Sequence, residues 1–349
     1  MRVVVTGATG NVGTSALASL ADEPAVEEIV GLARRRPRTV APKTTWVERD
    51  IVRDDIADDF TGADAVIHLA WAIQPSRDEA TLRAINVSGS KRVFRAAAEA
   101  GVGSLVYASS VGTYARGPKD RRVDESWPAT GIASSFYSRH KAAVERLLDT
   151  VEDANPSLRV VRLRPALIFK GEAASEIRRL FAGPFLPGLL LHRRLIPVAP
   201  RIPGLRFQAV HSLDVGDAYR RALLSDARGA FNIAAEPVIG PSELASVLDA
   251  RQVPVPGRLI RTLTDLTWRV RLQPTPPGWV DMALQVPLMD TDRAHRELGW
   301  SPTRSATDAL TELLEGLRRG EGAETPPLDP DAGGPARTGE VRTGVGARQ

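Results

Sequence analysis

The fold is decided by the start of the chain, where residues 2–13 read RVVVTGATGNVG. A strand pattern, Arg2–Thr6, runs into a glycine-rich turn, and a helical pattern, Val12–Leu20, follows at once. Gly7 permits the tight bend, Gly10 lets the backbone approach a pyrophosphate, and Gly13 allows close packing of the helix on the strand. The helix N-terminus then offers free N–H groups and a positive dipole end to the anion. The segment therefore predicts a dinucleotide-binding unit.

The turn supplies the first candidate site residues. Asn11 is the expected N-cap of the helix. We expect the dinucleotide to contact Gly7, Thr9, Gly10, Asn11, Val12 and Gly13. The alternative is a glycine-rich turn that binds no ligand, and the strand and helix on either side of the turn favour the binding interpretation.

The rest of the first 165 residues alternates short apolar runs with helical patterns. Further strands are predicted at Glu28–Ala33, Thr45–Glu48, Ala65–Ala70, Ser104–Ser109 and Arg159–Arg164, and helices at Glu79–Ala100 and Phe136–Thr150. Strands that are apolar on both faces are typical of a parallel sheet covered by helices. Residues 1–165 therefore predict an α/β fold with a doubly wound parallel sheet of the Rossmann type.

The pattern becomes less regular after Pro165. Strand candidates at Phe207–Val210 and Ala230–Ala234 flank a helix, Asp214–Leu224, and the segments near 207–235 are expected to return to the main sheet. Residues 166–206 and 236–319 are expected to form a smaller, mainly helical substrate lobe, including helices at Thr291–Leu298 and Ala306–Arg318. Residues 320–349 hold seven glycines and four prolines and few large apolar residues, so we expect a disordered tail.

Composition excludes several classes of protein and site. The 349 residues contain no cysteine, which excludes disulfides and thiolate metal sites. The most apolar stretch, Leu180–Leu191, is shorter than the roughly 20 residues of a membrane span, and no signal peptide is evident, so we expect a cytoplasmic protein without a membrane partner. The net charge of +4 comes from scattered basic residues, so we expect no nucleic-acid partner. The five histidines show no ligand spacing, so no metal is expected.

The end of the second predicted strand indicates the cofactor. An acidic residue roughly 20 positions beyond the glycines normally binds the ribose of NAD. This chain has Ala33 there, followed by Arg34, Arg35 and Arg36. A guanidinium suits a 2′-phosphate, so the sequence favours NADP over NAD, with Arg34 as the leading candidate. The alternative is that the arginines form a solvated turn.

Tyr137 and Lys141 are the candidate catalytic pair. Residues four apart share one face of a helix, and only five of the 46 basic residues are lysines, so a lysine at this spacing suggests a chemical need. An ammonium beside a phenol is expected to lower its pKa from about 10. The tyrosine can then exchange a proton with a substrate hydroxyl while hydride moves to or from a nicotinamide. The alternative is a surface tyrosine that packs on the lysine stem.

A serine is expected to complete this centre at the end of the fifth strand, where Ser109 and Ser110 stand. Carboxyl ends of strands in such sheets face the binding crevice, and a hydroxyl there can orient the substrate oxygen. The alternative is two serines that simply end a strand.

These motifs, in this order, resemble the extended short-chain dehydrogenase/reductase family, the NAD-dependent epimerase/dehydratase group. The resemblance covers roughly residues 1–318 and rests on seven motifs and a closing element: Thr6-Gly7-x-x-Gly10-x-x-Gly13, Asp50-Ile51, His68-Leu69-Ala70, Asn86-Val87-x-Gly89, Ser109-Ser110, Tyr137-x-x-x-Lys141, Leu163-Arg164-Pro165 and Asp290–Pro302. It implies an NAD(P)-dependent enzyme and favours Ser110 over Ser109 as the third catalytic residue.

The resemblance implies roles for further residues. Asp50 and Ile51 would flank the adenine, and Leu69 and Ala70 would lie along the ribose and phosphates. Asn86 would steady the helix beside the site, and the cofactor would also contact Tyr137 and Lys141. His68 is interpreted as a packed residue at a strand end. The family often pairs subunits through two long helices, here Glu79–Ala100 and Phe136–Thr150, so a homodimer is expected.

Two departures from the family concern the substrate. Leu167 stands where members that act on nucleotide sugars carry an asparagine, and Arg206-Phe207-Gln208 replaces their arginine followed by an aspartate–aromatic pair. With the apolar Phe181–Leu191 segment and Trp71, they favour a less polar alcohol or ketone, although these residues could equally form the core of the lobe. The sequence therefore predicts an NAD(P)-dependent oxidoreductase. The alternatives are a nucleotide-sugar epimerase or dehydratase and a non-catalytic NADP-sensing regulator.

Overall fold

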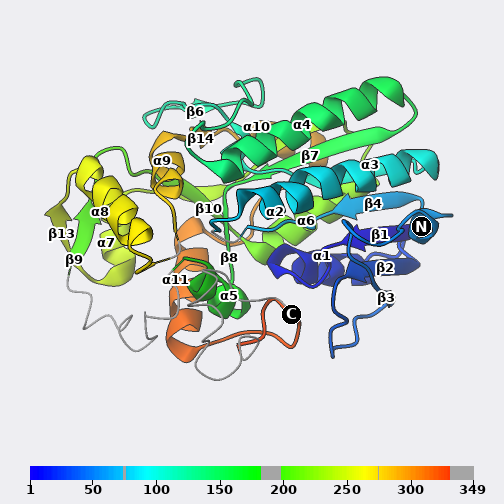
Figure 1. Ribbon diagram of the computed structural model, residues 1–349, viewed down its shortest axis with the longest axis horizontal. Helices are drawn as coiled ribbons and strands as arrows, with labels where there is room; N and C mark the ends of the chain where they lie inside the picture. Colours follow the sequence, from blue (N-terminus) through cyan, green and yellow to red (C-terminus); the bar gives the residue numbers. More distant parts are fainter. Residues whose placement is uncertain (74–75, 182–197, 274, 331–349) are drawn as a thin grey trace.

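A seven-stranded parallel sheet forms the centre of the protein (Figure 1). The computed structural model describes residues 1–73, 76–181, 198–273 and 275–330. The strands are β1 (Arg2–Thr6), β2 (Glu28–Ala33), β3 (Thr44–Glu48), β4 (Ala65–His68), β5 (Ser104–Ala108), β7 (Arg159–Pro165) and β11 (Gly229–Ile233). Their order is β11-β7-β5-β4-β1-β2-β3, and every neighbouring pair is parallel. The chain reverses its direction of growth between β1 and β4, the position at which such sheets bind ligands.

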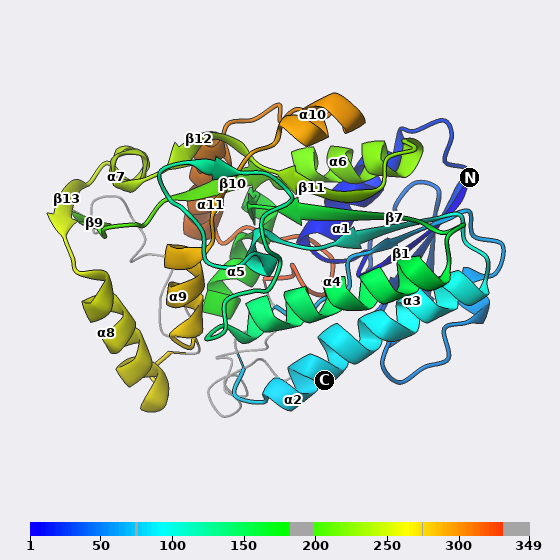
Figure 2. The same ribbon diagram turned by 90° about the horizontal axis from the view of Figure 1, so that it is seen from above.

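Helices cover both faces of this sheet, which confirms the predicted doubly wound fold. On one face, α1 (Asn11–Ala21) and α6 (Ser212–Leu224) share one apolar core with the strands. On the other face, α3 (Ser90–Glu99) and α4 (Phe136–Ala154) form a second core, and Figure 2 shows these two helices on the side opposite α6. A Cβ on Gly216 of α6 would lie 2.4 Å from the Ser15 carbonyl oxygen of α1, so this glycine allows the two helices to approach closely.

The C-terminal half adds a smaller part in which helices predominate. Its helices are α5 (Ala174–Phe181), α7 (Pro241–Leu248), α8 (Gly257–Arg269), α9 (Gly278–Gln285), α10 (Asp292–Leu298) and α11 (Ala306–Arg319). Three small sheets accompany them: β8 (Leu167–Phe169) with β10 (Phe207–His211) and β12 (Ala235–Ile239), β9 (Val198–Arg201) with β13 (Arg251–Pro254), and β6 (Arg122–Val123) with β14 (Leu288–Met289). Short helical turns lie at η1 (Asp58–Phe60), η3 (Val111–Thr113) and η4 (Gly171–Ala173).

Three local predictions differ from the structure. Gly10, and not Asn11, is the N-cap of α1, because the Asn11 amide instead donates to the Ile168 carbonyl oxygen at 3.4 Å. The helix predicted at 79–100 consists of α2 (Glu79–Arg83), a π-helical stretch, η2 (Ala84–Gly89), and α3. Of the two strands expected to return to the main sheet, β11 does so beside β7, whereas β10 pairs with β8, which continues the chain just beyond β7.

The predicted disordered tail is wrong for residues 320–330. Leu328 is fully buried, and the Ser175 hydroxyl donates to the Glu321 carbonyl oxygen at 2.7 Å. The Ala323 amide donates to the Leu328 carbonyl oxygen, which closes a turn against the lobe. One well-packed leucine thus orders a segment whose average composition favours disorder. Residues 331–349 and most of the apolar Phe181–Leu191 segment lie outside the described residues. Among the described helices, none has both the length and the hydropathy needed to cross a membrane.

Candidate active site

The turn between β1 and α1 contains two kinds of glycine: those that the packing of the protein requires and one that it does not. Gly7 has a φ of +72°, and a Cβ there would lie 2.6 Å from the Ala70 amide nitrogen. A Cβ on Gly13 would lie 2.4 Å from the Gly7 carbonyl oxygen, so the fold itself requires both residues to be glycine. At Gly10 the nearest protein atom would be 3.5 Å away, an ordinary contact distance. The protein therefore has no packing need for Gly10, whereas a ligand approaching the backbone does.

The N-terminus of α1 fits an anionic ligand. Gly10 offers no side chain to cap the helix, and the first turn carries no acidic residue. Asn11 lies at this end, and its side-chain oxygen is buried without a hydrogen-bond partner within the described chain. Thr9 is buried and Val12 half-buried beside it. An uncapped helix start, a glycine free of protein contacts and an unpaired buried polar atom together form a cradle that suits a pyrophosphate.

The other predicted cofactor contacts follow the carboxyl ends of neighbouring strands. Arg34 follows β2 and is exposed, while Asp50 and Ile51 follow β3. Leu69 and Ala70 follow β4, where the Leu69 amide donates to the Thr6 carbonyl oxygen at 3.0 Å. All these residues therefore lie along the sheet edge that bears the glycine turn.

Asn86 fixes the segment that follows Ala70. This residue lies in η2, is fully buried, and its amide spans the backbone of Ala72, accepting from the N–H at 2.7 Å and donating to the carbonyl oxygen at 3.0 Å. His68, at the end of β4, is equally well fixed: Nδ1 lies 2.6 Å from the Thr6 hydroxyl and Nε2 lies 2.9 Å from the Ser90 hydroxyl. Burial lowers the pKa of His68 to about 3, so its ring is neutral at physiological pH.

The structure brings Tyr137, Lys141 and Ser110 to one place at the carboxyl end of β5. Tyr137 and Lys141 occupy the first turns of α4, which begins at the N-cap Ser135, and both side chains are buried. Ser110 follows β5, and its hydroxyl forms a hydrogen bond with the phenol of Tyr137. A Cβ on Gly112 would lie 2.8 Å from the Tyr137 ring, so the turn after Ser110 is shaped to admit the tyrosine.

Ser109 lies in a different environment from Ser110. Its hydroxyl donates to the carboxylate of Glu145, which is paired with the buried guanidinium of Arg164 through Nε at 2.9 Å and Nη2 at 2.5 Å. Arg164 also donates to the Tyr114 hydroxyl at 3.0 Å. Ser109 therefore belongs to a buried ionic network beneath the site, and Ser110 alone of the two reaches the phenol.

The electrostatics of the tyrosine differ from the sequence prediction. Burial raises the pKa of Tyr137 to about 12, and the hydrogen bond from Ser110 opposes this only in part. Burial also lowers the pKa of Lys141 well below its ordinary value, and Glu145 opposes that shift. The Lys141 ammonium donates to the Ala108 carbonyl oxygen at 2.6 Å and lies 5.9 Å from the centre of the Tyr137 ring. The expected lowering of the phenol pKa by the ammonium is thus wrong for this arrangement.

Two tryptophans flank the tyrosine. The Trp71 ring lies edge-on to Tyr137 at 6.0 Å between centres and receives the Lys141 ammonium on its face at 3.5 Å. The Trp279 ring, from α9, lies 5.1 Å from the Tyr137 ring at an angle of 37°. Sequence reasoning singled out Trp71 but missed Trp279, because no local spacing links position 279 to position 137. The two tryptophan rings therefore line the site on either side of the Tyr137 side chain.

Comparisons with known proteins give one matching family and several relatives. The model of the NAD dependent epimerase/dehydratase family matches residues 3–182. An uncharacterized protein of Mycobacterium tuberculosis (strain ATCC 25618 / H37Rv) is 28% identical over 322 residues, 91% of this chain, although the chain spans only 30% of that relative's length. A 3 beta-hydroxysteroid dehydrogenase/Delta 5-->4-isomerase of M. tuberculosis (strain CDC 1551 / Oshkosh) is 26% identical over 339 residues, which cover 90% of this chain and 89% of the relative.

Solved structures share the fold. UDP-glucuronic acid 4-epimerase from Bacillus cereus, in complex with NAD, has a TM-score of 0.68 at 17% identity and covers 91% of this chain and 99% of its own. UDP-glucose 4-epimerase from Thermotoga maritima, with UDP-glucose, gives the same TM-score, identity and coverage. At this level of identity the likeness supports the fold and leaves the substrate open.

Proposed function

Because the chain belongs to the NAD-dependent epimerase/dehydratase family, we propose that it is an oxidoreductase that transfers a hydride between a nicotinamide dinucleotide and an apolar secondary alcohol or ketone. The observation that carries this proposal is the contact of Ser110 with a buried Tyr137, one helical turn from Lys141, beside the strand ends that bear the glycine turn. We assign residues 1–165, with α6 and β11, to the cofactor and the remaining described residues to the substrate lobe.

The side chains suit proton transfer to a carbonyl oxygen. With a pKa of about 12, the Tyr137 phenol keeps its proton at neutral pH and can donate it as a carbonyl carbon is reduced. The Ser110 hydroxyl, already bonded to the phenol, orients the same oxygen and stabilises its developing charge. A bound nicotinamide supplies or accepts the hydride. The Lys141 ammonium, held at the end of β5 by Ala108, is placed to bind a ribose hydroxyl.

Two features support NADP as the preferred cofactor. The end of β2 carries no carboxylate, and the exposed Arg34 follows it directly. A guanidinium at this position can form a bidentate pair with a 2′-phosphate. NAD is the ligand of the B. cereus epimerase, so NAD remains the alternative.

The apolar substrate is supported by the walls of the site. Trp71, Trp279 and Met282 surround the tyrosine, and Leu167 stands at the position where a nucleotide-sugar enzyme has an asparagine. The hydroxysteroid dehydrogenase relative acts on an alcohol of this class, so we propose a 3β-hydroxysteroid or a similar fused-ring alcohol. The fold shared with UDP-sugar epimerases makes a nucleotide-sugar epimerase the second candidate.

One set of assays separates the candidates. The purified protein is mixed with NADP or NADPH and with a 3β-hydroxysteroid, its 3-ketone or UDP-glucose, and nicotinamide absorbance is followed. An oxidoreductase changes that absorbance in proportion to product, whereas an epimerase converts UDP-glucose without net change. Tyr137→Phe is expected to lose about 100-fold or more in turnover while it retains cofactor affinity.

Tyr107→Phe is the matched control, because the buried Tyr107 hydroxyl has no hydrogen-bond partner within the described chain. We expect this variant to keep its activity. Full activity of Tyr137→Phe would contradict the proposal. Partner binding that depends on NADP and persists in an inactive Tyr137→Phe variant would instead favour the NADP-sensing regulator.

A homodimer stays part of the proposal. Helices α3 and α4 pack on each other along one face of the sheet, where the family pairs its subunits. Light scattering of the full chain measures this directly, and a monomeric mass at assay concentration would contradict it.

A further inference from the structure

Helix α8 carries a row of exposed apolar side chains. Leu259, Leu263, Leu266 and Val270 are 49, 48, 56 and 57% exposed, and Leu272, just beyond the helix, is 63% exposed. At 100° per residue, the four helical positions fall within about 60° of one another. No residue of α8 is buried. These five residues, which we call the α8 stripe, include most of the large leucine and valine side chains exposed along the described C-terminal half.

The side of α8 opposite the stripe holds the helix in place. Arg261 forms a bidentate pair with Asp281 of α9 through Nε at 2.8 Å and Nη2 at 3.2 Å. Trp268 receives the guanidinium of Arg77 on its ring at 4.3 Å. Both residues lie near 180° from the stripe on the helix, so the stripe faces outward. Figures 1 and 2 show α8 at the end of the molecule away from the seven-stranded sheet.

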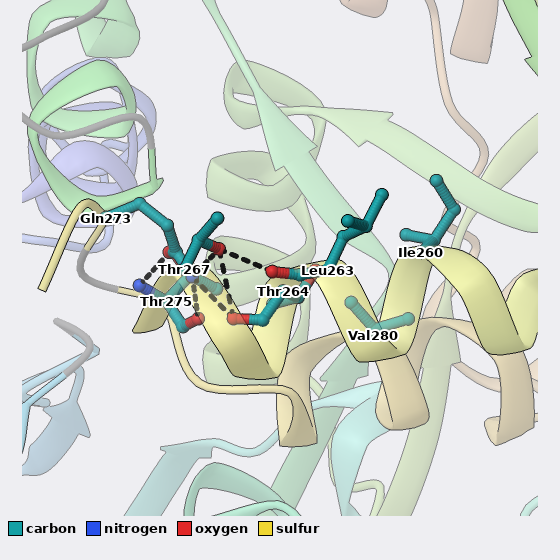
Figure 3. Close-up of a pocket in the computed structure, with 7 residues that line it drawn as sticks. All are labelled: Ile260, Leu263, Thr264, Thr267, Gln273, Thr275 and Val280. Carbon is teal, nitrogen blue, oxygen red and sulfur yellow. Dashed lines mark hydrogen bonds between the residues drawn. The ribbon is translucent and has the colours of Figure 1, made fainter. Parts of the chain in front are cut away.

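The C-terminal end of α8 is fixed as well. The Gln273 amide donates to the Thr264 carbonyl oxygen at 3.0 Å and to the Thr275 carbonyl oxygen at 2.8 Å, which ties Thr275 to the end of the helix (Figure 3). A pocket between α8 and α9 lies beside these bonds. Ile260 and Val280 lie at its apolar end, and Leu263 of the stripe lines its edge. Contacts with Asp281 of α9 and with Thr275 thus hold α8 in place behind the stripe.

Charge complements the stripe. Residues 257–272 contain four arginines against one aspartate. Asp265 pairs with Arg269, and Arg261 pairs with Asp281, whereas Arg258 and Arg271 are exposed near the two ends of the stripe. Helices with an apolar face flanked by arginines lie in the interface of anionic membranes. A second copy of the chain would instead bring two positively charged helices together, which is unfavourable.

We propose that the α8 stripe docks the protein on an anionic lipid surface, with Arg258 and Arg271 at the phosphates and the leucines among the acyl chains. The lack of a spanning segment in the sequence predicts no membrane partner, but an interfacial helix needs only one apolar face. Behind α8, Val280 lines the pocket and the preceding residue, Trp279, contacts Tyr137, so α9 connects the docked helix to the catalytic centre. The proposal does not depend on the substrate or on the cofactor.

Vesicle flotation of the full-length protein tests the proposal. Vesicles of phosphatidylcholine with phosphatidylglycerol are compared with vesicles of phosphatidylcholine alone, at low and high salt. We expect binding to the anionic vesicles only, weakened by salt because the arginines are screened. The double variant Leu259→Ser/Leu266→Ser is expected to bind at least about tenfold more weakly. Arg258→Gln/Arg271→Gln is expected to lose about 30-fold.

Matched controls are Leu224→Ser, an exposed leucine at the end of α6, and Arg146→Gln, an exposed arginine on α4. Both are expected to bind as the unchanged protein does. Leu259 and Leu266 are 49 and 56% exposed, neither lines the pocket between α8 and α9, and Arg258 and Arg271 are exposed, so these variants should keep their melting temperature. Lack of binding to anionic vesicles, equal binding to neutral vesicles or full binding of the double serine variant would overturn the proposal. So would a dimer in solution that the serine variant abolishes, since the stripe would then bind a second copy.

Discussion

The glycines of the turn after β1 give the sharpest test of the cofactor site, because the structure predicts different outcomes for Gly10→Ala and Gly13→Ala. In Gly13→Ala the new methyl group would lie 2.4 Å from the Gly7 carbonyl oxygen and 2.6 Å from the Ala8 carbonyl carbon. These are backbone atoms that cannot rotate away, so we expect a loss of about 3 kcal/mol in the free energy of unfolding. In Gly10→Ala the nearest atom is 3.5 Å away and φ is −78°, so we expect a loss below about 1 kcal/mol.

The effect on cofactor affinity should be the opposite of the effect on stability: Gly10→Ala should fold and yet bind the cofactor more weakly. If the turn holds the pyrophosphate, a methyl group on Gly10 would come between the ligand and the backbone, so Gly10→Ala is expected to weaken NADPH binding by about tenfold or more. Urea denaturation measures the free energy of unfolding, and titration of NADPH fluorescence measures the dissociation constant. Gly103→Ala is the matched control. As at Gly10, the nearest atom to the new methyl group would be a carbonyl oxygen 3.5 Å away, here that of Asp64.

The control is expected to change neither quantity, because Gly103 precedes β5 at the opposite edge of the sheet. Two results would refute the reasoning. Unchanged NADPH affinity in Gly10→Ala would mean that the turn does not hold the pyrophosphate. Unchanged stability in Gly13→Ala would mean that α1 does not pack closely on the backbone of Gly7 and Ala8.

Three further predictions concern single side chains. Arg34→Ala should lower the preference for NADP over NAD by about tenfold, measured as the ratio of the two dissociation constants, since a charge-assisted hydrogen bond contributes about 1.5–3 kcal/mol; an unchanged ratio would make Arg34 part of a solvated turn. His68 has a pKa of about 3 in the fold against 6.5 in the unfolded chain. The free energy by which the neutral ring stabilises the fold is therefore complete above pH 6.5 and is lost as pH falls toward 3. Urea denaturation measures the free energy of unfolding at pH 7 and at pH 5. The decrease in this free energy from pH 7 to pH 5 should be about 2 kcal/mol larger in the unchanged protein than in His68→Asn. Glu145→Gln should cost about 3–5 kcal/mol in stability, because the buried Arg164 loses its counter-charge, whereas Glu99→Gln in the exposed pair with Arg95 should cost less than about 0.5 kcal/mol.

Local sequence patterns predicted the central sheet well, for a physical reason. Each strand of a parallel sheet covered on both sides must be apolar on both faces, and runs such as 2–6 and 28–33 satisfy this within a few residues. The helix start at 136 and the turn at 7–13 also depend on neighbours in sequence. The location of Tyr137, Lys141 and Ser110 followed from these elements, because a parallel sheet brings its strand ends to one edge.

Local sequence patterns could not predict contacts between segments that lie far apart in the sequence. Trp279 meets Tyr137 through a helix that lies in the substrate lobe, and no spacing rule connects them. Leu328 is a single apolar residue in a stretch rich in glycine and proline, so composition concealed its burial. The π-helical stretch at 84–89 places Asn86 against the backbone of Ala72, and a uniform helical period does not reveal such a shift.

Electrostatics at the tyrosine show why shared helical position does not determine a pKa. Tyr137 and Lys141 do lie on one face, but both are buried, and loss of solvent disfavours the phenolate and the ammonium alike. The Ala108 carbonyl oxygen and the Trp71 ring hold the ammonium, so its charge acts on the strand end and only weakly on the phenol. The chain alone therefore favours a protonated Tyr137, which can donate a proton to a carbonyl oxygen. The reverse step, removal of a proton from an alcohol, needs the phenolate form of Tyr137 and is therefore favoured as pH rises.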